Sequence, residues 1–191
     1  TTGPLGKGSY YLRITRGDPN SAEALSIANG GGSYDQREIV DQSFLELVRL
    51  GLRSPNDPRI LATLEVTDAT IEIKTPKGDV YYRYPHDGYG ESKLGEAPDG
   101  HGNPWPLLIG ERSIYEVAQS RSEHPASWYL PVMSSMANAG GMLPEQVFPD
   151  GTGTGSATPL AWAHAEYIVF TYAVKQAQVP DMPAVVAARY A

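Results

Sequence analysis

The sequence predicts an all-α fold in which long loops join the helices. Apolar residues recur at helical spacing in several separate stretches. N-cap residues and first-turn prolines stand where these stretches begin. The connections are too long for a four-helix bundle, whose loops are short. They indicate part of a helical toroid of about five or six helices, with polar and aromatic residues gathered on loops at one end.

The first two helices are expected in the N-terminal half of the chain. One begins near Asp41, a natural N-cap, and ends near Gly51. The next begins at Pro58, whose missing N–H costs nothing in a first turn, and continues towards Thr75. The β-branched residues in the range 66–73 could also form a strand, but the length and the i, i+3, i+4 spacing favour a helix.

The remaining helices follow a turn and a long loop. Residues 76–79 form the turn, and residues 81–84 are expected to be briefly extended. Thr158 is expected to cap a helix with Pro159 in its first turn. Earlier in the chain, Asn29 and the three glycines that follow it predict a loop over residues 29–32, because glycine permits positive φ. The further helices are expected at residues 107–121, 125–139, 159–176 and 182–190.

Length and charge limit the classes of partner. The chain has 191 residues, enough for one domain with a core, and the whole range 1–191 is interpreted as a single, partial domain. Its net charge of −7 and the lack of a basic patch argue against nucleic acid and anionic membranes as partners, and suit a neutral ligand such as a sugar. There are 0 cysteines, which excludes disulfides and thiolate metal sites. An opening on Thr1 indicates a processed product or a fragment, or else a chain shortened for expression.

Residues 142–167 are the most informative stretch for function. Glu145 lies between two prolines, and a glycine-rich loop then leads to a helix that carries Trp162. A carboxylate can take a proton, glycines let the backbone approach a ligand, and an indole offers a flat apolar face to a sugar ring. The loop 85–106 is long for a compact domain, and loops of that length are usually functional or disordered. Together these features favour a carbohydrate site, for which residues 85–106 supply His86, Asp87, Tyr89, Glu91 and Trp105.

Other kinds of site fit the sequence less well. The four histidines show no metal-ligand spacing, and His164 and Glu166 point away from each other on a helix. The glycines of 151–155 lack the lysine of a phosphate loop, and no Ser-His-Asp set stands out. Each candidate also has a plainer interpretation: Glu145 as a solvated loop carboxylate, Arg83 as an ordinary ion-pairing residue, residues 87–88 as a turn, and Trp105 and Trp162 as core tryptophans.

Four separate runs resemble glycoside hydrolase family 15, the glucoamylase and glucodextranase family. They occur in the order that the family shows and span most of the chain, and residues 29–50 also look like the bacterial branch. The runs are 82–91 (YRYPHDGYGE), 103–112 (NPWPLL followed by GER), 143–147 (LPEQV) and 154–166 (TGSATPLAWAHAE).

The resemblance implies both a fold and a reaction. The family fold is an (α/α)6 toroid, and this chain resembles its C-terminal half. Family enzymes hydrolyse α-glucosidic bonds with inversion and release glucose from chain ends. Glu145 matches the position of the catalytic general base, whereas no run matches the segment that carries the general acid upstream. Glu145 can therefore supply one of the two carboxyl groups that inversion requires.

The resemblance also implies the residues that bind sugar. Arg83 and Asp87 match positions that hydrogen-bond the terminal glucose. Tyr89 and Trp162 match aromatic residues of the same subsite, and Trp105 matches one near the next sugar. Glu111 and Arg112 belong to a matching run, and we interpret them as structural.

The expected protein is an inverting exo-acting α-glucoside hydrolase that works on α-linked glucose oligo- and polysaccharides. Its expected partner is the N-terminal portion of the same enzyme, as a companion chain or a cleaved fragment. No cofactor is required, and the sequence leaves a calcium ion open. Trehalose or dextran hydrolysis on the same fold, and a sugar-binding or assembly fragment without activity, are the alternatives. Export is implied for some family members only.

Overall fold

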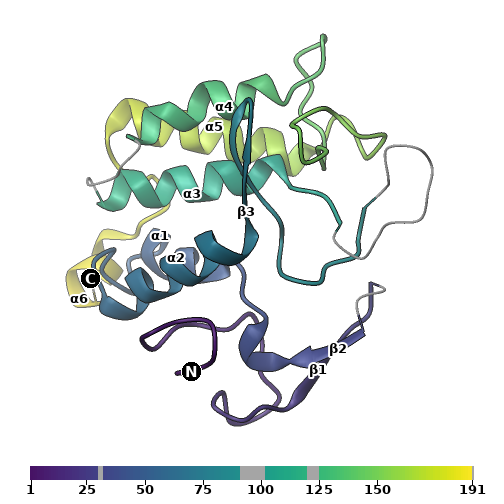
Figure 1. Cartoon of the computed structure of the whole chain (residues 1–191). Coiled ribbons are helices and arrows are strands. Elements are labelled where there is room, and N and C mark those ends of the chain that lie inside the picture. The colour runs from purple at the N-terminus through teal and green to yellow at the C-terminus, as the bar shows by residue number, and fades with distance from the viewer. Residues whose placement is uncertain (30–31, 91–101, 120–124, 191) are drawn as a thin grey trace.

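The computed structural model describes residues 1–29, 32–90, 102–119 and 125–190. Two long helices, α3 (Pro106–Gln119) and α5 (Ala161–Gln176), pack against each other at its centre. In Figure 1, α4 (Tyr129–Ser135) lies above α3, whereas α1 (Glu46–Arg49) and α2 (Pro58–Ile71) lie below it. The long connections gather beyond one end of these helices, on the right of Figure 1. The fold thus places the loops that carry the candidate site on one side, as expected.

The main core fills the space between α3, α4, α5 and the strand that precedes the long loop. Its buried side chains include Val80, Leu107, Ile114, Met133 and Phe170. A second cluster joins α1 and α2 to α3 through Phe44, Leu45, Val48, Ile60, Leu64 and Tyr115. Both clusters come from the apolar spacing that predicted the helices.

Helix α2 begins where the sequence predicts and ends earlier. The Asp57 side chain accepts the backbone N–H of Arg59, and Pro58 occupies the first turn. The helix ends at Ile71, so the expectation that it continues towards Thr75 is wrong. Residues 72–75 instead form a strand, so the strand alternative raised for residues 66–73 holds only for the last two of them.

That strand, β3 (Glu72–Thr75), pairs antiparallel with β4 (Gly78–Tyr81). Thr75 faces Gly78 across the turn, and Gly78 has a φ of +122°, which glycine adopts without a Cβ clash. Val80 and Tyr81 are buried on the core. This burial, together with ladder hydrogen bonds, outweighs the helical periodicity of residues 72–75.

The other helices are mostly shorter than expected. Asp41 accepts the N–H of Ser43, and a 3-10 turn (Ser43–Leu45) leads into α1. Another 3-10 turn (Ala126–Trp128) precedes α4, which ends at Ser135 and not near residue 139. The chain ends in α6 (Ala184–Tyr190). Arg121, the expected end of α3, and residues 91–101 of the long loop lie outside the described residues.

Helix α5 ends at Gln176 as predicted, but its start differs. It begins at Ala161, after Leu160 in an extended conformation without a side-chain cap. Thr158 donates its hydroxyl to the carbonyl of Ser156, and Pro159 follows a cis peptide bond, so neither residue caps α5 or opens its first turn. The backbone N–H of Leu160 donates to the carbonyl of Leu143 and fixes the helix start to the LPEQV run.

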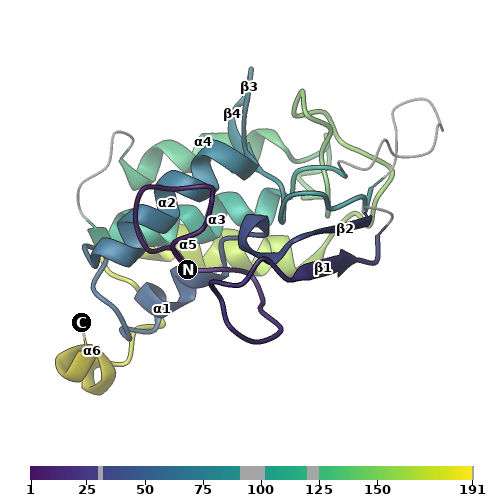
Figure 2. The same cartoon turned by 60° about the horizontal axis from the view of Figure 1, so that its bottom comes forward.

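A hairpin near the N-terminus was not expected. Strands β1 (Ala24–Ile27) and β2 (Gly32–Asp35) pair antiparallel, with Ile27 opposite Gly32. Of the predicted glycine loop, Asn29 lies two residues after the end of β1 and Gly32 begins β2, and residues 30–31 lie outside the described part. In the view of Figure 2 the hairpin extends along the same side as the long loops.

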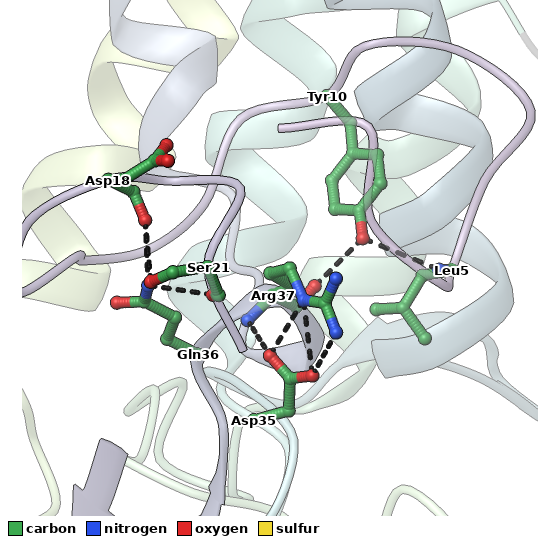
Figure 3. A network of polar contacts seen from close by, with 7 residues as sticks. All are labelled: Leu5, Tyr10, Asp18, Ser21, Asp35, Gln36 and Arg37. Carbon is green, nitrogen blue, oxygen red and sulfur yellow. Dashed lines mark hydrogen bonds and ion pairs between the residues drawn. The ribbon is translucent and has the colours of Figure 1, made fainter. Parts of the chain in front are cut away.

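Hydrogen bonds fasten the base of this hairpin (Figure 3). The buried amide of Gln36 donates to the backbone carbonyls of Asp18 and Ser21. Arg37 makes a two-pronged ion pair with Asp35, and its carbonyl accepts the Tyr10 hydroxyl at 2.8 Å. Because such contacts satisfy buried polar groups, they hold the N-terminal segment against the strand end.

Among the described helices, none has the length and apolar character needed to cross a bilayer.

Candidate active site

Glu145 lies on a loop that is tied to the start of α5. Its backbone N–H donates to the carbonyl of Ala157 at 2.9 Å. Two residues earlier, the N–H of Leu143 donates to Nε2 of His164 in the first turns of α5, also at 2.9 Å. His164 therefore acts as an acceptor that positions the loop, and the described structure gives it no role as a metal ligand.

Gln146 turns inward and locks this loop to the long loop. Its buried side chain accepts the Nδ2 hydrogen of Asn103 and donates to the carbonyl of Tyr89, each at 3.3 Å. The Gln146 N–H donates to Oγ of Ser156 at 3.0 Å. Because Gln146 is fixed on the buried side, the neighbouring Glu145 is left at the surface of a hollow.

That hollow is an open cavity of about 500 Å³, a size typical of small-molecule sites. The Tyr89 hydroxyl lies 3.5 Å from Oε2 of Glu145 and can donate to it. Among the described residues that line the cavity, Glu145 is the one carboxylate. The lining comprises Asn29, Gly88, Tyr89, Gly90, Glu145, Gln146, Ser156 and Ala157.

Arg83 and Asp87 form a two-pronged ion pair beside this cavity. Nε and Nη2 of Arg83 lie 2.6 and 2.8 Å from the two carboxylate oxygens of Asp87, which is only 3% exposed. Burial works against the charge of Arg83, but the hydrogen bonds and charge of Asp87 outweigh it and raise the pKa of the guanidinium. The guanidinium therefore stays charged, and its further N–H groups are available to a ligand.

Two aromatic rings enclose the same guanidinium. The Arg83 guanidinium carbon lies 4.8 Å from the ring centroids of both Tyr89 and Trp105, within cation–π range. Trp105 is 6% exposed and tilts against Tyr89 with a centroid separation of 6.2 Å. The structure therefore places both rings against Arg83, and Tyr89 also contacts Glu145.

Trp162 lies in a different hollow. It is 56% exposed on the first turn of α5 and lines a second cavity of about 550 Å³, together with Arg83 and Glu111. Arg83, which forms the ion pair with Asp87, also lines this second cavity. The chain thus brings Glu145, Tyr89, Arg83, Asp87 and Trp105 together, whereas Trp162 joins them only through Arg83.

The second cavity holds a group of charges that the sequence did not single out. Arg49 pairs with Glu166 at 3.1 Å and with Asp181 at 2.5 Å. Burial, and then the nearby charges of Glu166 and Glu46, raise the pKa of Glu111 to about 8. Glu111 was interpreted as structural, and no sequence pattern marks its burial.

Arg112 does have the structural role that was expected of it. Its guanidinium contacts Asp68 of α2 at 2.5 Å and Glu116 of α3 at 2.8 Å. The contact with Asp68 joins α3 to α2. In the described parts of the chain, no group of three or more His, Asp or Glu side chains could hold a metal ion.

Comparisons with known proteins identify relatives of this chain. A model of glycosyl hydrolases family 15 matches residues 2–172. A glucoamylase of Clostridium sp. (strain G0005) is 54% identical over an aligned length of 192 residues, and the alignment covers 98% of this chain and 27% of that protein. An uncharacterized glycosyl hydrolase of Methanocaldococcus jannaschii is 27% identical over 155 residues, or 75% of this chain and 23% of that protein.

A solved structure shows the same fold. The crystal structure of a bacterial glucoamylase complexed with acarbose superposes with a TM-score of 0.91 at 52% identity, over 99% of this chain and 28% of that one. This chain thus spans about a quarter of the length of the relatives it matches. The similarity confirms the expected fold class, a helical part of an (α/α)6 toroid. Because the family model covers most of its length, the chain belongs to glycosyl hydrolases family 15.

Proposed function

We propose that this chain forms part of an inverting, exo-acting α-glucoside hydrolase that releases glucose from α-glucan ends. The observation that carries the proposal is the position of Glu145, whose carboxylate faces the cavity beside the Arg83–Asp87 ion pair. Membership of the family and similarity to a glucoamylase support it.

Glu145 is the proposed general base. As an ionised carboxylate it accepts a proton from a water molecule while the water oxygen bonds to the anomeric carbon. The bond from that carbon to the glycosidic oxygen breaks on the opposite face, and a carboxylic acid protonates the departing oxygen. That acid belongs to a further segment of the catalytic domain, roughly 6.5–9.5 Å from Glu145 in an inverting enzyme. The Tyr89 hydroxyl orients the carboxylate of Glu145 by donating a hydrogen bond to it.

Arg83, Asp87 and the aromatic residues are proposed to bind the sugar. Asp87 takes two guanidinium N–H groups and fixes the plane of Arg83, which directs its other donors at adjacent hydroxyls. The proposed roles of Tyr89, Trp105 and Trp162 follow from their apolar faces, which suit the C–H face of a sugar. Trp162 reaches the sugar from the second cavity, across Arg83.

The further segment is proposed to pack on an exposed apolar face of α5. Ile168 and Tyr172, four positions apart, share one side of this helix, and both are exposed. Large apolar side chains grouped on one helix face usually mark a surface that another element covers. The chain's share of its relatives' length supports an N-terminal portion of the same enzyme as that element.

Analysis of the native material tests both parts of the proposal. We expect intact-mass and size measurements to find this sequence joined to, or co-purifying with, a second portion of the domain. The same fractions should release glucose from maltotriose. A stable monomer of this mass alone would contradict the shared domain. Faster turnover of trehalose or dextran than of maltotriose would show that the enzyme hydrolyses one of those substrates instead. Acarbose binding without any turnover would favour the non-catalytic alternative.

A further inference from the structure

Asn29 brings the tip of the first hairpin into the candidate site. It lies two residues after the end of β1 and lines the cavity that holds Glu145. Its Nδ2 group lies 3.0 Å from Oδ1 of Asp87 and 3.0 Å from the hydroxyl of Tyr84. The residue lies 58 positions from Asp87 in sequence, so only the fold reveals this contact.

Asp87 depends on the hydrogen bonds that surround it. Its Oδ1 atom accepts from Asn29, from Arg83 and from the backbone N–H of Tyr89, and its Oδ2 atom accepts from Arg83. A buried carboxylate must be satisfied in this way, because an unpaired charge is costly to bury. Among these donors, Arg83 and Tyr89 lie within four residues of Asp87 in sequence, whereas Asn29 comes from the distant hairpin and therefore fixes the carboxylate relative to another part of the molecule.

The hairpin is held firmly enough to act as such a support. Its base is fixed by the Gln36 and Arg37 contacts of Figure 3. Nearer the tip, the ring of Tyr34 on β2 stacks on His86 with centroids 3.5 Å apart and planes 4° from parallel. Two separate contacts, Tyr34 with His86 and Asn29 with Asp87, thus dock the hairpin on the start of the long loop.

We propose that Asn29 is a positioning residue for the Arg83–Asp87 pair, and that the β1–β2 hairpin is thereby part of the sugar site. The inference rests on the proposed function of that pair. The Asn29 amide donates a hydrogen bond at every pH, which keeps Asp87 in the rotamer that aligns the guanidinium with adjacent sugar hydroxyls.

The substitution Asn29→Asp tests this with little change of shape. It replaces the donor by a carboxylate about 3 Å from that of Asp87, where two like charges repel. We expect roughly 30-fold weaker acarbose binding near neutral pH in the assembled enzyme, relative to wild type. On acidification the ratio to wild type should recover, since two adjacent carboxyls can share one proton and regain the donor.

Asn29→Ala and Asn56→Asp complete the test. The alanine variant lacks the donor at every pH, so its affinity should stay roughly 10-fold below wild type without recovery. Asn56 is exposed in the turn before α2, and Asn56→Asp adds the same charge there with no expected effect. Titration calorimetry with acarbose measures the affinity of each variant and of wild type at each pH. In the ratio of the two affinities, the effect of ionisation of acarbose itself cancels.

The pH dependence must be assigned against the other groups around Asn29. The neighbouring charged or titratable groups are Arg83, His86 and Asp87 in the segment 83–87, Arg13 over the Tyr84 ring, and Glu145 across the same cavity. Asn29→Ala and Asn56→Asp retain all of these groups. A recovery seen only in Asn29→Asp therefore belongs to the new carboxyl.

Two results would overturn the inference. One is an affinity of Asn29→Asp for acarbose that stays within twofold of that of Asn56→Asp at all pH values. The other is a loss of affinity that is the same in both Asn29 variants and independent of pH. Glucose release by the wild type is a separate readout. If it is absent while the binding differences persist, the proposed hydrolysis fails and the positioning role stands.

Discussion

Replacing Glu145 by glutamine in the assembled enzyme should lower kcat on maltotriose by about a thousandfold. The amide has the shape of the carboxylate but cannot take a proton from water. Because Gln146, Leu143 and the backbone of Glu145 hold the loop independently of this side chain, the cavity should keep its form. Acarbose binding should therefore remain within a few-fold of wild type.

The matched control for this variant is Glu65→Gln. Glu65 is exposed on α2, away from both cavities, and its substitution removes the same charge. Steady-state kinetics on both variants should show full turnover in Glu65→Gln. If Glu145→Gln turned over within tenfold of the control, Glu145 would not be the base.

Replacing Glu111 by glutamine should make the protein more stable at alkaline pH. The pKa of Glu111 is raised to about 8 by burial and then by the charges of Glu166 and Glu46, whereas a carboxyl in the unfolded chain titrates near 4.5. A group with a raised folded pKa supports the folded state below its unfolded pKa and loses that contribution as pH rises through the folded pKa. Wild-type stability should therefore decline from about pH 5 to about pH 8 on account of this group.

The glutamine variant lacks that decline, because its amide stays neutral and resembles the protonated acid. Near pH 9 the free energy of unfolding should favour Glu111→Gln over wild type by on the order of 4 kcal/mol, and near pH 4 the two should agree. Urea unfolding of wild type, Glu111→Gln and Glu65→Gln across this range makes the comparison. A constant difference between wild type and Glu111→Gln at all pH values would show that Glu111 does not titrate there.

The sequence predicts the helices where local signals agree. Asp57 and Pro58 mark the start of α2, and the apolar spacing of α3 and α5 matches their buried faces. Prediction from the sequence fails where pairing with another segment determines the secondary structure. Residues 72–75 keep a helical spacing but pair with β4, and β1 becomes a strand only by pairing with β2 across a glycine tip. The Thr158-Pro159 pair has the composition of a helix start but lies before α5.

The candidate site shows the same division. Arg83, Asp87 and Tyr89 are close in sequence, and their meeting with Glu145 follows from two loops at one end of adjacent helices. Asn29 and Glu111 could not be found that way. Asn29 acts through a contact between distant segments, and Glu111 looks like any helical glutamate until its burial beside other carboxylates is known. The separation of Trp162 from Glu145 likewise depends on where α5 begins.

The central claim is that Glu145 directs water to the face of the sugar opposite the leaving oxygen, which inverts the anomeric centre. The anomer of the first glucose released from an α-linked maltooligosaccharide tests it most directly. Proton NMR spectra recorded before mutarotation should show β-glucose formed first by the assembled enzyme, and a Glu145→Gln sample should form almost none. Initial release of α-glucose would contradict the account, because retention requires a nucleophile where Glu145 is proposed to act on water.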